Sequence, residues 1–574
     1  MRRTCCLLAF AFTAQAQYDV LTFHGDRQRT GWIANETILT PENVASGEFG
    51  PIWSSPQLDS VTIGGIAYKP HLYASPLYVD RTQTVYAAST NGFVYAINAA
   101  SNRRPAGAIL WKTQLNTPSG SLDGGVPVGV LGTPIIDLNI APPRLYVASA
   151  DAAAGWQVFA LNLNDGAILP GWPVTISDAA VAPINQNGPA RFSAASLQSQ
   201  RGALNLSPDG RLLYVPFGAY NDNATGWMIA IDTTAPAIAS AFAGAPSITA
   251  DANGGMWASG GPAVDADGYV YSTTGNTTTT ITNAPGYWSQ SVLVWSPGTP
   301  LRLAGTYTPW NYCQMDAADA DLSGGAVVVL PDLGAANTST PHLITFGGKQ
   351  GNQYLVDRDN MPGSLISKPP CSNDSSTEAS LVPPFPQPQF GQQGPLNVFG
   401  PYSEQYAQVD WAKGRSTGAF FRAADGGNYL FVTGSSKAAV NSVDTVPPCI
   451  VKLRIVTTPG SPAYLSVVAS ENTLGFLSPG SPWVTSNGPD HAIVWVLVAN
   501  VGRSASLADP NAPHPILYGL DPVTLQVLWA STPAMLNVGG KYNAPGFGRG
   551  QVFVGTDRIQ AFGLMSRPPR RRGN

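Results

Sequence analysis

Three carboxylates stand within six residues of the sequence, at Asp316, Asp319 and Asp321. Carboxylate oxygens are the ligands that Ca²⁺ prefers, so this spacing is a candidate metal site. Acidic turns are also common on protein surfaces, and such a turn is the alternative interpretation. A second acidic stretch, residues 265–268 (Asp-Ala-Asp-Gly), lacks the length and the terminal Glu of an EF-hand loop, so we expect a hairpin turn there.

No familiar catalytic motif accompanies these acids. The five histidines are scattered, without the spacing of a zinc site, and the sequence has no nucleophile elbow, phosphate-binding loop or Cys-x-x-Cys pair. The net charge of −4, with no basic face, argues against a nucleic-acid partner. Tryptophan is abundant, with 14 residues; we expect most of them to pack between sheets, and a sugar-binding surface is the alternative.

The two ends of the chain have compositions of their own. Residues 1–16 combine two arginines, an apolar stretch over 5–12 and an Ala-Gln-Ala cleavage site, which predicts a signal peptide and a secreted or periplasmic protein. No later run reaches the ~20 apolar residues of a membrane span. Residues 566–574 form a basic tail, which we expect to be solvated and disordered.

Three cysteines remain after the signal peptide, Cys313, Cys371 and Cys449. An odd number in an oxidising compartment allows one disulfide bond and one further thiol. The sequence leaves open which two of the three are paired.

Short β-branched runs separated by turn residues fill the rest of the chain. The 574 residues include 60 Gly and 50 Pro but only 11% charged residues, a composition typical of short strands joined by tight turns. A unit of about four strands recurs, most clearly over residues 73–80, 84–89, 92–98 and 107–111. Such units can shield one another's apolar faces, so the pattern predicts an all-β fold with a single β-propeller.

The number of repeats favours eight four-stranded blades, with seven as the alternative. The last repeat, over residues 552–562, lacks its final strand, and residues 49–53 (Phe-Gly-Pro-Ile-Trp) resemble that missing strand. Pairing the two would close the ring and remove its open sheet edges. We therefore assign residues 17–565 to one propeller, with a long Pro-rich surface loop over 368–400.

Two stretches end in a tryptophan at the end of a repeat. Residues 96–111 run from Ala-Ile-Asn to Gly-Ala-Ile-Leu-Trp111, and residues 520–529 end in Val-Leu-Trp529. They resemble the Ala-x-Asp-x-x-Thr-Gly-x-x-x-Trp docking motif of the quinoprotein alcohol dehydrogenases, a family of propellers with PQQ repeats. The resemblance implies that each tryptophan stacks between neighbouring blades.

That family holds pyrroloquinoline quinone (PQQ) and Ca²⁺ at the centre of its ring. Residues 254–276 are similar to the segment that bears its quinone-stacking Trp and its calcium-binding Asn, which implies these roles for Trp257 and Asn276. Residues 348–358 are similar to the segment whose Lys contacts the quinone, which implies that Lys349 faces the cofactor. In the family, Ca²⁺ polarises the quinone while a carboxylate accepts the alcohol proton.

The chain also departs from the family. In Tyr307-Thr-Pro-Trp-Asn311, Asn311 stands where the catalytic Asp is expected, and an amide cannot accept a proton at neutral pH. No Glu lies near residues 217–220 to bind calcium. We therefore predict a binding or scaffold module for a small molecule, a glycan or an envelope protein. The alternative is an alcohol or sugar dehydrogenase dependent on PQQ and calcium with a rearranged site, so enzymatic activity stays open.

Overall fold

The computed structural model describes residues 18–565, except 103, 123–124, 221–222, 249–253, 279–282, 310, 350, 372–396, 400–413, 435–448, 503–504 and 510. The predicted signal peptide, the basic tail and most of the Pro-rich loop lie outside these residues. Among the described residues, the helices are short, and none is long and apolar enough to cross a membrane.

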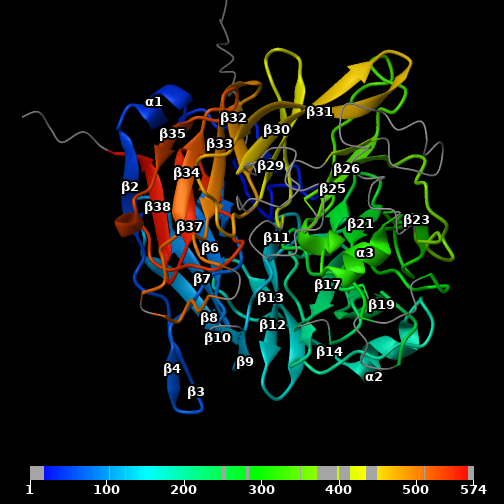
Figure 1. The fold of residues 1–574 in the computed structure, drawn as a ribbon. Helices are drawn as coiled ribbons and strands as arrows, with labels where there is room; N and C mark the ends of the chain where they lie inside the picture. The colour runs from blue at the N-terminus through cyan, green and yellow to red at the C-terminus, as the bar shows by residue number, and fades with distance from the viewer. Residues whose placement is uncertain are drawn as a thin grey trace, which may run out of the picture.

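The chain folds as an eight-bladed β-propeller, as predicted, and each blade is built on four antiparallel strands (Figure 1). Blade 1 is β5–β8 (Leu77–Val79, Thr84–Ala88, Phe93–Asn98, Ile109–Gln114) and blade 2 is β11–β14 (Ile135–Asp137, Arg144–Asp151, Gly155–Asn162, Val174–Ile176). Blade 3 is β15–β19 (Gln198–Ser199, Asn205–Leu206, Leu212–Ala219, Trp227–Asp232, Ala237–Ala243), with β15 and β16 both paired to β17. Blade 4 is β20–β23 (Ala263–Val264, Val270–Thr273, Val292–Trp295, Leu303–Tyr307) and blade 5 is β24–β27 (Val328–Val329, Leu343–Gly347, Gln353–Asp357, Asn397–Phe399).

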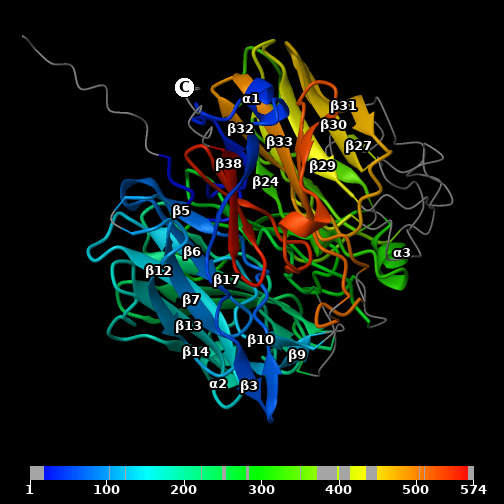
Figure 2. The same cartoon turned by 90° about the vertical axis from the view of Figure 1, so that its left-hand side faces the viewer.

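The remaining blades complete the ring. Blade 6 is β28–β31 (Ala419–Arg422, Asn428–Thr433, Ile450–Thr458, Ser461–Glu471), and blade 7 is β32–β35 (Trp483–Asn487, Asp490–Val498, Ile516–Leu520, Val527–Ala530) with β1 (Trp32–Ile33) added in parallel to β32. Blade 8 combines β36–β38 (Gly546–Gly548, Gln551–Gly555, Ile559–Leu564) with β2 (Phe49–Ser54). In the described part of the chain two hairpins lie outside the blades, β3–β4 (Val61–Ile63, Ile66–Tyr68) and β9–β10 (Ser119–Leu122, Val126–Val128), and the first projects from the molecule (Figure 2). The residues that the structure describes form the α-helices α1 (Pro41–Ala45), α2 (Asp178–Val181) and α3 (Tyr312–Ala317).

The predicted closing strand is confirmed. Strand β2 pairs antiparallel with β38, from Phe49 opposite Leu564 to Ser54 opposite Gln560, so the blue start of the chain lies beside its red end (Figure 1). The outer edge of the last blade is thereby covered by a strand that lies about 500 residues away in sequence, which is the device that removes an unpaired edge.

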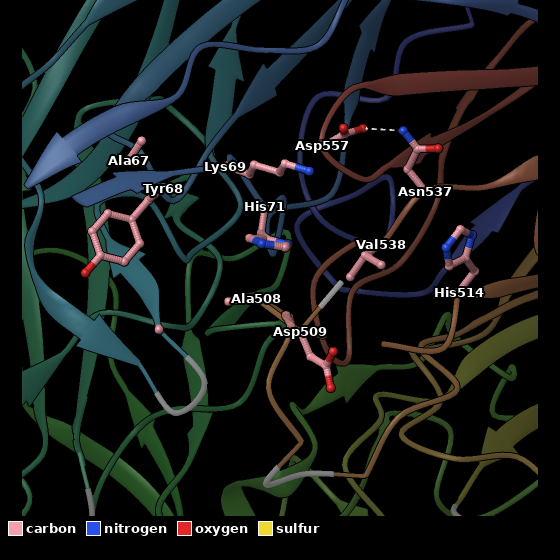
Figure 3. Close-up of a pocket in the computed structure, with 12 residues that line it drawn as sticks. Ala67, Tyr68, Lys69, His71, Ala508, Asp509, His514, Asn537, Val538 and Asp557 are labelled. Carbon is pink, nitrogen blue, oxygen red and sulfur yellow. Dashed lines mark hydrogen bonds between the residues drawn. The ribbon is translucent and has the colours of Figure 1, made fainter. Parts of the chain in front are cut away.

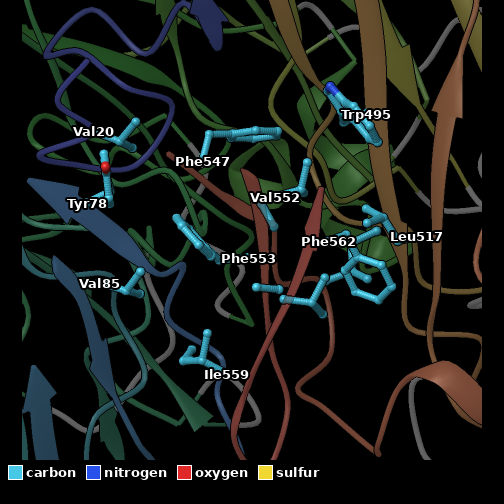
Figure 4. Close-up of a cluster of buried hydrophobic side chains, with 14 of the residues drawn as sticks. Val20, Tyr78, Val85, Trp495, Leu517, Phe547, Val552, Phe553, Ile559 and Phe562 are labelled. Atoms are coloured by element: carbon cyan, nitrogen blue, oxygen red, sulfur yellow. The ribbon is translucent and has the colours of Figure 1, made fainter. Parts of the chain in front are cut away.

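Burial changes along each blade from the axis to the rim. All five residues of β6 are buried because neighbouring blades cover both faces of the sheet, whereas β8 at the rim alternates half-buried and exposed residues. The apolar runs of the sequence therefore form inner strands, as expected for a sheet packed on two sides. One core cluster joins blades 1, 7 and 8 through Tyr78, Trp495 and Phe553 (Figure 4).

The tryptophan docking predicted from the motif is also present. The indole Nε1 of Trp111 in blade 1 donates to the Leu163 carbonyl of blade 2 at 3.2 Å. Gly166, at φ +76°, leaves room for this ring, since a Cβ there would lie 2.5 Å from it. Trp529 of blade 7 packs edge-on against Phe49 and Phe562 of blade 8, with ring centres 4.9 and 5.4 Å apart.

Residues 18–38, which we call the N-terminal belt, form hydrogen bonds with all eight blades. Belt carbonyls accept hydrogen bonds of 2.7 to 3.0 Å from the innermost strands of six blades, and these pairs are Val20–Tyr78, Leu21–Ile136, Arg27–Val264, Gln28–Val329, Thr30–Phe420 and Gly31–Val484. The buried Arg29 guanidinium donates to Leu204 O of blade 3 at 2.8 Å, and Glu36 accepts from the Gly550 N–H of blade 8 at 3.0 Å. The belt thus links the blades to one another at the end of the propeller where the inner strands end.

Candidate functional site at the channel mouth

The segments that lead into the inner strands meet at the other end of the propeller axis, and we call this end the channel mouth. Their backbones pack directly against those of neighbouring blades. A Cβ at Gly261 would lie 1.9 Å from Ala203 O, and one at Gly480 would lie 2.0 Å from Asn543 O. Only glycine allows such approaches, so these segments are held firmly and can position the side chains beside them.

The structure brings Trp257 and Lys349, which come from blades 4 and 5, together at this mouth. The Lys349 ammonium lies 5.1 Å from the centre of the Trp257 ring, a cation–π distance. It pairs with Asp319 at 2.6 Å and also with Asp321. The two carboxylates raise the pKa of Lys349 although burial acts against them, so the side chain is a cation at neutral pH.

Asn276 lies in the same cluster, beside a glycine that permits close contact. Its backbone N–H donates to the Asp321 carboxylate at 2.6 Å. A Cβ at the preceding Gly275 would lie 2.7 Å from that carboxylate and 3.1 Å from the Trp257 indole nitrogen. The Thr-Gly-Asn sequence therefore lets the backbone, and not only the side chain, approach the acidic group.

Asn311 is fully buried and caps α3, where its carbonyl accepts from the N–H groups of Gln314 and Met315. One turn later, Asp316 accepts from the Thr277 N–H at 3.1 Å. Burial raises the pKa of Asp316 to about 7, and the neighbouring Lys368 opposes that rise. A buried carboxyl that titrates near neutrality is able to exchange a proton at physiological pH.

Lys368 had no signal in the sequence, where it only opens the Pro-rich loop. Its ammonium donates to Ser289 Oγ at 2.6 Å and lies 4.2 Å from the Tyr312 ring centre. Burial lowers the pKa of Lys368 to about 8. The disulfide Cys313–Cys371 holds this segment against α3, which settles the pairing that the sequence left open, and Cys449 is a buried free thiol.

Sequence reasoning also missed a basic and aromatic group that spans the mouth. Arg201 of blade 3 donates to the Leu131 and Lys541 carbonyls of blades 2 and 8, and lies 5.4 Å from the Tyr73 ring centre. Arg415 of blade 6 donates to the Tyr542 hydroxyl at 3.2 Å. These residues precede the inner strands of their repeats, so an alignment of the repeats was the one signal that could have grouped them.

The acidic residues do not fit a calcium ion. Ca²⁺ needs six to eight oxygens, including open carboxylates. Here Lys349 already pairs with Asp319 and Asp321, and within the described residues no three His, Cys, Asp or Glu side chains are placed to hold a metal. The second acidic stretch is the expected turn, since Asp265 accepts from the N–H groups of Asp267 and Tyr269 and pairs with Arg358.

Comparisons with known proteins show similarity in fold only. A scan against protein families and a search of curated proteins each gave no match. Solved structures with similar folds include Sqt1 of Saccharomyces cerevisiae (8% identity, TM-score 0.46, covering 90% of this chain and 100% of that chain) and the Pan2 WD40 domain of Neurospora crassa (9%, 0.35, 87% and 90%). Another is a chain of the Mitotic Checkpoint Complex (11%, 0.36, 78% and 92%).

Proposed function

We propose that the protein is a binding propeller whose channel mouth receives a small anionic ligand, one that carries a carboxylate or a phosphate. The observation behind this proposal is Arg201. Its guanidinium is partly buried among carbonyls and a tyrosine ring, and it forms no ion pair with any carboxylate in the described part of the chain. Buried charges in proteins are normally paired, so a ligand anion would supply the missing partner.

The neighbours of Arg201 suit such a ligand. Arg415 adds positive charge, whereas the charge of Lys349 is already matched by Asp319 and Asp321, and the Trp257 and Tyr542 rings offer flat surfaces beside them. Burial lowers the pKa of Arg201 to about 10, which leaves it charged at neutral pH and indicates a poorly solvated cation. An anion bound there would meet strong, little-screened attraction.

We also propose that the protein works outside the cytoplasm. The signal-like residues 1–16 motivate this location, and the Cys313–Cys371 disulfide supports it, because structural disulfides persist in oxidising compartments. Cell fractionation with an antibody to the chain tests the proposal, and recovery of the full-length, uncleaved protein in the cytoplasm would contradict it.

The binding proposal is tested by isothermal titration with citrate, phosphate and PQQ at low ionic strength. We expect at least one of them to bind saturably, and Arg201→Gln to weaken that binding about 10- to 100-fold, the loss of one charge-assisted contact. The matched control is Arg211→Gln, an exposed arginine at the opposite end of blade 3, which should bind as the wild type does. Equal binding by the two variants, or no binding of any probe, would contradict the proposal.

A second candidate is a PQQ-dependent alcohol or sugar dehydrogenase. It is favoured by the meeting of Trp257, Asn276 and Lys349 around Asp321, since these were matched to the family separately. PQQ would supply hydride acceptance, with Trp257 as stacking surface and the mouth cations as partners for its carboxylates. Alcohol-dependent dye reduction with added PQQ, lost in Trp257→Ala, would establish this activity; PQQ binding without dye reduction would leave the binding function alone.

A further inference from the structure

A separate pocket lies beside the mouth, between blades 1, 7 and 8 (Figure 3). Its cavity of about 380 Å³ falls within the usual range of small-molecule sites. The lining comes from the stretch before blade 1, the β9–β10 turn, the β33–β34 loop of blade 7, and the segments before β36 and after β37. Five separate segments of the chain are thus folded around one cavity.

Two histidines in this lining are fixed in one tautomer. His71 Nδ1 lies 3.1 Å from Gly539 O, and His514 Nδ1 lies 2.8 Å from Pro533 O. A carbonyl can only accept, so each Nδ1 carries a proton, and in the neutral form of either ring Nε2 is the acceptor. Burial lowers the pKa of His71, which keeps its ring neutral.

The oxygen atoms of the lining are acceptors too. The Asn537 amide nitrogen donates to Asp557 at 2.8 Å, so its carbonyl oxygen points the other way (Figure 3). Asp509 is exposed, and its carboxylate accepts from the Asn511 N–H at 2.8 Å, which leaves further lone pairs. The pocket therefore offers many hydrogen-bond acceptors, which call for a ligand rich in donors.

Charge in the pocket nearly cancels. Arg558 pairs with Asp557 at 2.9 Å, and the exposed Lys69 of the lining adds a second cation, so two cations and the two carboxylates of Asp557 and Asp509 are equal in number. Neither a strong cation nor a strong anion is therefore favoured. Tyr68 and Val538 add apolar surface of the kind that packs against the C–H faces of a sugar ring.

From this juxtaposition of fixed acceptors, cancelled charges and apolar surface, we infer that the pocket binds a neutral carbohydrate the size of a mono- or disaccharide. Hydroxyl groups would donate to His514, Asn537 and Asp509, and a ring face would rest on Tyr68. The site is distinct from the proposed anion site of the mouth, so each proposal can be tested independently of the other.

The inference is tested with purified full-length protein and a panel of glucose, galactose, mannose, N-acetylglucosamine, maltose and cellobiose. By titration calorimetry we expect at least one sugar to bind with a Kd between about 10 μM and 1 mM. His514→Ala and Asn537→Ala, both at half-buried positions, should each weaken binding about five- to tenfold. His342→Ala, at a histidine of blade 5 outside the pocket lining, should leave it unchanged.

A second measurement needs no variant of the pocket. The sugar that binds best is made as a diazirine derivative, cross-linked to the wild type and mapped by mass spectrometry. Label within residues 67–71, 507–514 or 537–538 would support the inference. Label confined to other segments, no binding by any sugar, binding unchanged in both variants, or tighter binding of spermidine or citrate to this pocket would overturn it.

Discussion

Removing the Phe49 side chain should destabilise the propeller in blade 8, where the first and last parts of the chain pair. Phe49 is 2% exposed and packs against Trp495 and Trp529, with ring centres 5.4 and 4.9 Å apart. A buried aromatic side chain removes about 150–250 Å² of surface from contact with water. At roughly 25 cal/mol per Å², this corresponds to about 4–6 kcal/mol, of which alanine retains a part. Phe49→Ala should therefore lower the free energy of unfolding by about 3–5 kcal/mol.

The assay is urea unfolding followed by tryptophan fluorescence, combined with hydrogen exchange of blade 8. Because β2 covers the edge of β38, the variant should exchange faster in β37 and β38 than in blades 3 to 5. Ile52→Ala is the matched control, since Ile52 lies on the same strand and is 36% exposed, and its cost should stay below about 1 kcal/mol. A loss below about 1 kcal/mol for Phe49→Ala, with blade 8 protected as in the wild type, would refute the closure argument.

Two further predictions concern the mouth and the belt. Gly261→Ala should lower the free energy of unfolding in urea by about 2–4 kcal/mol, because its Cβ would meet Ala203 O. Gly426→Ala is the control, since Gly426 also has a positive φ but open space around it, and this change should lower that free energy by about 1 kcal/mol. Equal losses in the two variants would contradict the packing described for the mouth. Burial lowers the pKa of His24 to about 3 from about 6.5 in the unfolded chain, so the unfolded state takes up a proton first on acidification. The stability that neutral His24 contributes is complete above pH 7, and the free energy of unfolding should fall by about 2 kcal/mol between pH 7 and pH 5. The His24→Asn variant should lack this loss. Urea unfolding of both proteins at the two pH values measures it, and no difference between the proteins would mean that His24 is solvated.

Local pattern was enough to predict the blades. Strands such as Phe93–Asn98 carry consecutive apolar residues bounded by turn residues, and this signal is contained within about ten neighbouring positions. The closing strand at Phe49 was predictable for the same reason, since an incomplete repeat at one end implies its missing piece elsewhere. Trp111 could be placed because its motif fixes both the strand and the contact that it makes.

The binding surfaces were decided by the tertiary structure. Arg201, Lys349 and Arg415 are more than 60 residues apart in sequence, and only the circular order of the blades brings them to one mouth. Their charge states also depend on burial and on Asp321, which no local pattern encodes. Sequence therefore determined the repeated sheets, whose stability rests on near neighbours, whereas ring closure determined which distant side chains share a site.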